Sequence, residues 1–196
     1  MTAKRYIREQ DLLCDAYRLG VAIADSGFRP TVIAGLWRGG STVGIAVQEC
    51  LQYLGIATDH IALRTSYRGL TSYQRMVDNP EAEIRVHGTQ YLLETLDAED
   101  GLLIVDDVFS SGLTTRAVVQ RLASRLKRNT PNTIRIAAPW YKPTHNRTDG
   151  RPDYYVHTTE DWLVMPYELT GLTRAEIAAH KPFMLPILDR LDSPLA

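Results

Sequence analysis

The sequence lacks the features that mark several large classes of protein. Its 196 residues contain only two cysteines, Cys14 and Cys50, and no Cys-x-x-Cys pair, so a disulfide framework or a cysteine-based zinc site is not expected. No apolar run approaches the roughly 18 residues that a membrane-spanning helix needs. The N-terminal segment has charges but no apolar core or small-residue cleavage site of a secretory signal. We therefore expect a cytoplasmic protein whose two thiols are buried.

The sequence also has little excess of charge of either sign. Lys and Arg total 22 and Asp and Glu total 23, which leaves a net charge of -1. Binding to nucleic acid or to an anionic membrane requires a basic surface, so neither partner is expected. The hydrophobic content of 44% and the charged content of 23% are ordinary for a globular protein. The length fits a single domain over residues 1–196.

What the sequence does contain is an alternation of short apolar runs and longer amphipathic segments. Apolar residues repeat at helical spacing in three segments, 12–23, 43–54 and 118–126. Between them lie apolar, β-branched runs that are typical of buried strands, and these cover residues 31–36, 60–64, 101–107 and 133–140. Such an order predicts an α/β fold with a central, mostly parallel sheet flanked by helices.

The remaining segments are less regular. Residues 65–88 are polar and predict a loop, and arginines lie in it and beside it: Arg64, Arg68, Arg75 and Arg85. Residues 89–96 predict a short helix or strand. Further short strands are expected at 153–157 and 161–165, with a last short helix near 173–180.

The strongest motif is VDDVFSSGLTT, which begins where an apolar strand ends. Asp106 and Asp107 provide carboxylates that can accept hydrogen bonds from vicinal hydroxyls or hold a divalent cation. A turn that opens a helix then supplies hydroxyls and backbone amides, which favour a phosphate group; its residues are Ser110, Ser111, Gly112, Leu113 and Thr114. Carboxylates next to a phosphate turn suit a 5-phosphoribosyl group. In the alternative interpretation the aspartates only cap the turn.

A second motif, Arg38-Gly39-Gly40, follows the strand predicted at 31–36. A glycine pair lets the backbone approach an anion closely, and the arginine adds a bidentate donor. Ligands of open α/β sheets bind beyond the carboxyl ends of the strands, so both motifs are expected at the same edge of the sheet. An Arg-Gly-Gly sequence by itself is also common as a simple turn.

The first motif resembles the phosphoribosyl pyrophosphate signature of type I phosphoribosyltransferases, which has an apolar strand, two acids, two variable residues and a Ser/Thr/Gly turn. The resemblance extends over residues 31–172. It implies the fold of that family, in which a small hood is formed from the termini and the C-terminal third. It also implies that Arg38, Gly39 and Gly40 receive pyrophosphate, and that the Trp37–Arg38 peptide entering their loop is cis.

Purine phosphoribosyltransferases carry a Ser-Tyr pair in a mobile loop that closes over the site, and Ser66-Tyr67 matches this pair. Closure would exclude water from a reactive ribosyl cation. As an alternative, residues 65–88 form an ordinary solvated loop.

Two later segments are similar to the base site of 6-oxopurine phosphoribosyltransferases, especially the bacterial xanthine-guanine and hypoxanthine enzymes. A lysine donates to a carbonyl oxygen, and an indole offers a stacking face for a flat heterocycle. The resemblance implies that Lys142 contacts the 6-oxo group, Trp162 stacks on the base with the Leu163 carbonyl beside it, and Glu168 reaches the metal. The alternatives are a surface lysine and a tryptophan of the ordinary core.

One position departs from the family's pattern. Many 6-oxopurine enzymes have an aspartate three residues after the second acid, where it handles the proton on purine N7, and this chain has Ser110 there. A serine of ordinary acidity is a poor base at neutral pH. Adenine and uracil enzymes do have a small residue at this position.

These features together predict an Mg²⁺-dependent transferase that converts phosphoribosyl pyrophosphate and hypoxanthine, guanine or xanthine to a nucleoside 5'-monophosphate and pyrophosphate. Asp106, Asp107 and Ser110 are the candidate catalytic residues, and Asp106, Asp107 and Glu168 the candidate metal ligands. The resemblance implies a homodimer or homotetramer.

The alternatives are a regulator that binds nucleotide or RNA without useful turnover, and a pyrimidine phosphoribosyltransferase. A dinucleotide-binding oxidoreductase is disfavoured because no G-x-G-x-x-G follows the first strand.

Overall fold

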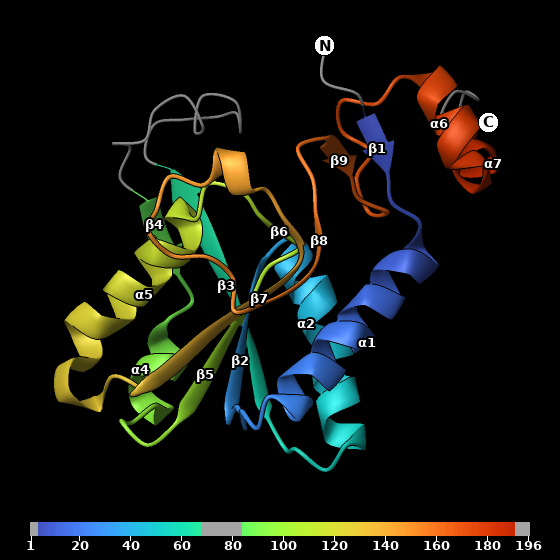
Figure 1. Ribbon diagram of the computed structural model, residues 1–196. Helices are drawn as coiled ribbons and strands as arrows, with labels where there is room; N and C mark the ends of the chain where they lie inside the picture. The colour runs from blue at the N-terminus through green and yellow to red at the C-terminus, as the bar shows by residue number, and fades with distance from the viewer. Residues whose placement is uncertain (1–3, 68–83, 191–196) are drawn as a thin grey trace. The chain divides into compact units, whose positions relative to one another are not determined.

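The computed structural model describes residues 4–67 and 84–190 (Figure 1). The chain divides into two compact units. The larger comprises Gln10–Glu160, and the smaller combines Met1–Glu9 with Asp161–Ala196. That residues 1–196 form one domain stays a prediction. None of the helices in the described ranges is long and apolar enough to cross a membrane.

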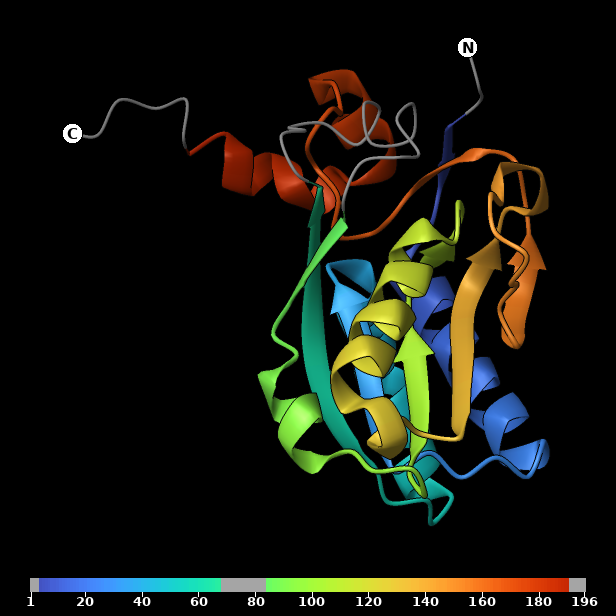
Figure 2. The same cartoon turned by 90° about the vertical axis from the view of Figure 1, so that its left-hand side faces the viewer.

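A mostly parallel sheet forms the centre of the larger unit (Figures 1 and 2). Its strand order is β4-β3-β2-β5-β7-β6, and β8 also pairs with β7. β4 runs antiparallel to β3, and the other paired strands are parallel. The strands are β2 (Val32–Trp37), β3 (Asp59–Tyr67), β4 (Ile84–His87), β5 (Gly101–Val105), β6 (Val108–Phe109), β7 (Thr133–Tyr141) and β8 (Tyr154–Thr158). The predicted fold class is therefore confirmed.

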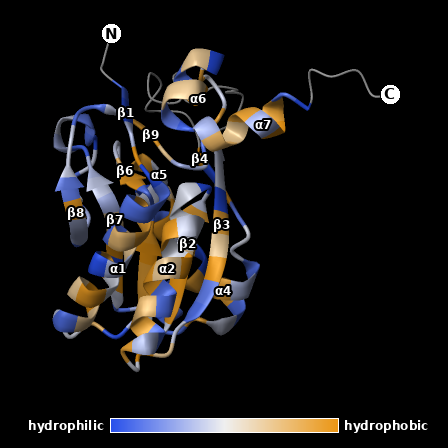
Figure 3. Ribbon diagram, turned by 90° about the vertical axis from the view of Figure 1, so that its right-hand side faces the viewer, coloured by the Kyte–Doolittle hydropathy of each residue, from blue (hydrophilic) through white to orange (hydrophobic). Residues whose placement is uncertain are grey.

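Helices cover both faces of this sheet because the strands are apolar on both sides. Figure 1 shows α1 (Glu9–Asp25) and α2 (Gly39–Tyr53) on one face, and α4 (Gln90–Thr95) and α5 (Leu113–Leu126) on the other. Alternate residues of β2, such as Ala34 and Leu36, join Leu122 of α5 in a buried cluster. Figure 3 shows hydrophobic residues concentrated in the central strands and in the helices beside them. The amphipathic periods in the sequence thus identified α1, α2 and α5 correctly, and the segment left open between helix and strand is the helix α4.

The smaller unit joins segments from both ends of the chain. β1 (Lys4–Tyr6) pairs in parallel with β9 (Trp162–Val164). The ring of Tyr6 stacks on His180 at 3.6 Å between centroids. The unit also contains α6 (Arg174–His180), the 3-10 turn η3 (Pro182–Met184) and α7 (Leu185–Leu188). The smaller unit is thus built from both ends of the chain, as the resemblance implied for the hood, although it takes less of the C-terminal part than the expected third.

Two local predictions are wrong. Residues 65–88 do not form one loop, because β3 continues to Tyr67 and β4 pairs with it antiparallel. The cysteines are not both buried: Cys14 is exposed and Cys50 half-buried, and both are free thiols. Cys14 lies between Leu12 and Ala16, which face the core, so the helical period turns it towards solvent.

The start of α2 lies against the end of β5. β2 lies between β3 and β5, so the connections from β2 and β5 leave the sheet in opposite directions, which is the arrangement that leaves a ligand crevice at the carboxyl ends. The backbones come so close that a Cβ atom on Gly40 would lie 2.3 Å from the carbonyl oxygen of Val105 and 2.8 Å from Cα of Asp106. Only a residue without a side chain fits this position.

We predict that Gly40→Ala destabilises the protein by about 1–3 kcal/mol, because backbone must shift to admit the methyl group. Denaturation in urea measures this change. Gly150→Ala is the control, since its Cβ would meet nothing nearer than Thr148 Oγ1 at 3.9 Å, and it should change stability by less than about 0.5 kcal/mol. Equal unfolding midpoints for the two variants would contradict the close approach.

Candidate functional site

Asp106 and Asp107 follow β5 directly, and both are half-buried. The Asp107 N–H donates to Asp106 Oδ1 (3.0 Å), and the Val108 N–H donates to Asp107 Oδ1 (2.9 Å). The local hydrogen bonds expected of aspartates that cap a turn are therefore present. Burial, followed by the charge and hydrogen bond of Asp107, raises the pKa of Asp106 well above its ordinary value. A cation or hydroxyl donors beside this pair would stabilise its charged form.

The metal-binding capacity of this strand end rests on two carboxylates. Within residues 4–67 and 84–190, no group of three or more His, Cys, Asp or Glu side chains could hold a metal ion. Mg²⁺ is usually held by one or two carboxylates, with waters and substrate phosphates as its other ligands. Asp106 and Asp107 therefore fit Mg²⁺ that arrives with a phosphorylated substrate. Glu168 belongs to the smaller unit, so its role as a further ligand stays a prediction.

The turn at 110–114 has the geometry of an anion site. Gly112 is the N-cap of α5 in a left-handed conformation, with φ 73°. The Leu113 N–H donates to Ser111 Oγ (3.4 Å), and Ser110 and Ser111 are half-buried. The amides of the first helical turn and the helix dipole favour a negative charge here. The turn thus provides what a phosphate monoester needs, directly after the two carboxylates.

The segment after β7 braces this turn, and the sequence carried no signal for it. The Arg147 N–H donates to the Ser111 carbonyl (3.0 Å). Thr148 lies over Gly112, where a Cβ would come within 2.5 Å of its Oγ1. Positive φ and this close approach together explain the glycine at 112. The contacts join residues more than 30 positions apart, so no local pattern could reveal them.

Backbone pairing places Lys142 beside Phe109, which follows Asp107 by two residues. β6 pairs with the end of β7, and the Lys142 N–H donates to the Phe109 carbonyl (2.9 Å). The lysine is only 8% exposed, which rules out the alternative of an ordinary surface lysine. The hydrogen bond from Thr144, followed by the positive charges of His145 and Lys142, holds the pKa of Glu160 below its usual value.

The Arg38-Gly39-Gly40 motif lies beside the end of β2. The Trp37–Arg38 peptide bond is cis, which confirms the expectation drawn from the family resemblance. Arg38 is exposed, and the two glycines are buried as the first residues of α2. The motif therefore starts a helix rather than forming an extended loop, and it adds a second helix N-terminus to this edge of the sheet.

Five predicted site residues remain, three in the smaller unit and two in β3. Trp162, Leu163 and Glu168 belong to the smaller unit, and Trp162 is 43% exposed, so it is not an ordinary core residue. Ser66 lies in β3, where a hydrogen bond of 2.9 Å joins its Oγ to His87 Nε2. The expectation of a mobile loop is wrong for Ser66-Tyr67, because both residues pair with β4. Residues 68–83 lie outside the described part of the chain.

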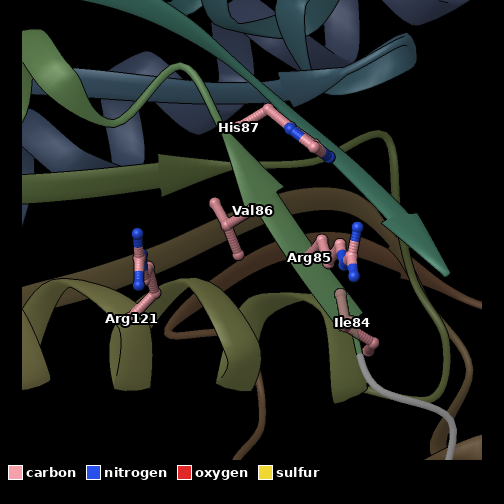
Figure 4. Close-up of a pocket in the computed structure, with 5 residues that line it drawn as sticks. All are labelled: Ile84, Arg85, Val86, His87 and Arg121. Carbon is pink, nitrogen blue, oxygen red and sulfur yellow. The ribbon is translucent and has the colours of Figure 1, made fainter. Parts of the chain in front are cut away.

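A pocket of about 310 Å³ lies near β4 and α5. Ile84, Arg85, Val86 and His87 of β4 line it with Arg121 of α5 (Figure 4). Figure 4 shows Arg85 and His87 on the opposite side of β4 from Val86 and Arg121, so these cationic groups do not converge on one point. None of the predicted site residues lines this pocket.

Comparison with known proteins supports the reading of the β5 motif. Residues 10–170 match the model of the phosphoribosyl transferase domain family. A human protein, phosphoribosyltransferase domain-containing protein 1, is 29% identical over 147 residues, which is 74% of this chain and 61% of that protein. The chain thus spans less than two thirds of the length of this curated relative.

Two solved structures share the fold. A purine phosphoribosyltransferase from Pyrococcus horikoshii Ot3 has a TM-score of 0.63 and 23% identity, covering 87% of this chain and 97% of that one. A hypothetical protein from Neisseria gonorrhoeae with bound ppGpp has a TM-score of 0.68 and 17% identity, covering 93% and 96%. From the family match over most of its length we conclude that the chain belongs to the phosphoribosyl transferase domain family.

Proposed function

We propose that this chain transfers the 5-phosphoribosyl group of phosphoribosyl pyrophosphate to a 6-oxopurine base, hypoxanthine or guanine first and xanthine next. The products are a nucleoside 5'-monophosphate and pyrophosphate. One observation carries the proposal. Asp106 and Asp107 are followed closely along the chain by the N-terminal turn of α5, and the Lys142 N–H donates to the carbonyl of Phe109, which lies between the aspartates and that turn.

In this proposal the larger unit holds the sugar phosphate. Asp106 and Asp107 accept hydrogen bonds from the ribose hydroxyls, and the turn of residues 110–114 binds the 5'-phosphate. Mg²⁺, when bound beside the two carboxylates, neutralises charge on the pyrophosphate.

The bond between ribose C1' and a pyrophosphate oxygen breaks, and a bond between C1' and a purine nitrogen forms. Arg38 and the first amides of α2, at Gly39 and Gly40, stabilise the negative charge on the departing pyrophosphate. Positioning and electrostatic stabilisation supply most of the rate in such a reaction. A proton must leave the base, and Ser110 stands where many relatives keep a carboxylate.

Three residues are proposed to select the base. Lys142 donates to the 6-oxo group. Trp162, which is 43% exposed, offers its ring for stacking, and the Leu163 carbonyl accepts from the base. Lys142-Pro143 and Trp162 argue against a pyrimidine. Residence in the cytoplasm and assembly as a dimer or tetramer remain predictions.

A regulator that binds a nucleotide without useful turnover is the second candidate. The similar structure from Neisseria gonorrhoeae carries ppGpp, and Ser110 lowers the capacity for proton transfer. An assay of pyrophosphate release over a panel of bases separates the two functions. Release with hypoxanthine or guanine supports the enzyme. Tight binding of ppGpp or a nucleoside monophosphate, with no release for any base, favours the regulator.

We predict that Asp107→Ala abolishes the binding of phosphoribosyl pyrophosphate in the presence of Mg²⁺, because a carboxylate that orients both ribose and metal is lost. Titration calorimetry measures the affinity, and circular dichroism checks the fold. Asp25→Ala removes an exposed carboxylate at the end of α1 and should leave the affinity within about two-fold of wild type. Unchanged affinity in Asp107→Ala would remove this residue from the ribose site.

A separate prediction concerns the missing proton acceptor. Ser110→Asp should raise turnover by about ten-fold or more, or make its pH dependence steeper, because general base catalysis contributes roughly two to four orders of magnitude. Steady-state kinetics between pH 6 and 9, roughly the range around the pKa values of such bases, measure the effect. If neither kcat nor its pH profile changes, Ser110 serves only the phosphate turn.

A further inference from the structure

Two lysines with the same local sequence are buried in the described part of the chain, Lys142 at 8% and Lys181 at 4% exposure. Each precedes a proline that starts a 3-10 turn, η2 (Pro143–His145) or η3 (Pro182–Met184). A proline favours extended backbone in the residue before it, so each lysine leaves its strand or helix at a sharp angle. The proposed reaction uses Lys142 and leaves Lys181 without a role.

The Lys181 ammonium is directed at the protein backbone. Its Nζ donates to the carbonyl oxygens of Met165 (2.9 Å) and Pro166 (2.5 Å). The lysine's own N–H donates to the Ile177 carbonyl (2.7 Å), which fixes its backbone at the end of α6. All of these residues belong to the smaller unit. Lys181 therefore ties α6 to the peptide groups that follow β9.

Burying an ammonium group is costly, and the cost shows in its titration. Burial lowers the pKa of Lys181, while the charges of Glu9 and Glu168 act in the opposite direction. An apolar side chain of similar size can often replace buried charged groups with no loss of stability. What only a cation supplies here is two charge-assisted hydrogen bonds that set the direction of two carbonyl groups.

Those carbonyls lie at the centre of the segment assigned to the base. The Glu168 N–H donates to the Met165 carbonyl (3.0 Å), and the Met165 N–H donates to Glu168 Oε2 (3.1 Å), so the two residues close a turn. On the other side, the Ile7 N–H donates to the Val164 carbonyl (3.0 Å). Segment 162–168 is thus anchored by β1, by its own turn and by Lys181.

We propose that Lys181 is a positioning residue that fixes segment 162–168, so that the ring of Trp162 and the carbonyl of Leu163 hold the orientation that receives the base. Lys181 itself does not contact the base. The inference rests on the proposed function, and it deepens that function by naming what holds the base-binding segment in the smaller unit. Removing the ammonium would leave the Met165 carbonyl with the Glu168 N–H alone and would take the ammonium donor from the half-buried Pro166 carbonyl. The segment would then shift to reach water.

The test compares Lys181→Met with the wild type and with Arg174→Met. The methionine keeps the length of the side chain and removes its donors. The control removes an exposed cation of α6 that pairs with Asp189. Two readouts are measured: amide hydrogen exchange within residues 163–168, where every residue except Pro166 carries an amide hydrogen, and the KM values for the base and for phosphoribosyl pyrophosphate.

We expect exchange of these amides to become about ten-fold faster or more in Lys181→Met, as follows from losing hydrogen bonds to a charged group. The KM for the base should rise by about ten-fold, with the KM for phosphoribosyl pyrophosphate within about two-fold of wild type. Arg174→Met should match the wild type in both readouts. A base KM unchanged in Lys181→Met, or exchange at 163–168 equal to that of wild type, would overturn the proposal.

The exchange readout separates this proposal from the proposed function. If the wild type transfers to no base, the proposed function fails, and exchange at 163–168 alone decides whether Lys181 fixes the segment. If Lys181→Met does not fold, Lys181→Arg, which keeps donors but changes their reach, is judged by the same exchange and KM criteria.

Discussion

The contact between Gly40 and the end of β5 is the constraint on which the site depends. A side chain at this position would overlap the backbone of Val105 and Asp106. Because there is none, the first turn of α2 can lie directly against the strand end that carries the aspartates. The contact places Arg38 and the two carboxylates at the same edge of the sheet, at the point where the connections from β2 and β5 diverge. A pyrophosphate group and a ribose could then be held at one strand edge.

The electrostatics of this edge follow from the same arrangement. Two carboxylates, Asp106 and Asp107, end an apolar strand, and burial, followed by the charge of Asp107, raises the pKa of Asp106. Directly beside them α2 and α5 begin, and their N-terminal amides favour anions. The negative carboxylates of Asp106 and Asp107 therefore lie close to the positive N-termini of the two helices. A ligand that carries hydroxyls, phosphates and a bound cation satisfies both sets at once, whereas an uncharged ligand would leave both unsatisfied.

The sequence predicted the parts of this structure that depend on neighbouring residues. The apolar runs located the strands and the amphipathic periods located the helices. The role of the Asp-Asp motif and the cis peptide at Trp37–Arg38 were expected because short segments of the chain resemble those of a known family. Pairings between distant segments were missed. Lys4–Tyr6 is a short polar strand whose pairing with β9 has no local signal, and Ile84–His87 joins β3 only because the chain turns back. The prediction that Cys14 is buried was wrong because it rested on the usual burial of free thiols and not on the position of Cys14 in its helix, which faces solvent.

The two Lys-Pro pairs show why residue roles are harder to predict than folds. Lys142 and Lys181 have the same neighbour, the same 3-10 turn and nearly the same burial. Their surroundings differ: Lys142 lies near the carboxylate of Glu160, whereas Lys181 donates to two backbone carbonyls. A lysine whose donors are taken up by the backbone can orient a segment but is poorly suited to bind a ligand. Under the proposed function, stacking on the base would then depend on how firmly the smaller unit holds its segment, whereas the Lys142 contact and sugar-phosphate binding would depend on the larger unit. Changes near Lys181 could alter the preferred base without disturbing the strand end that binds the ribose.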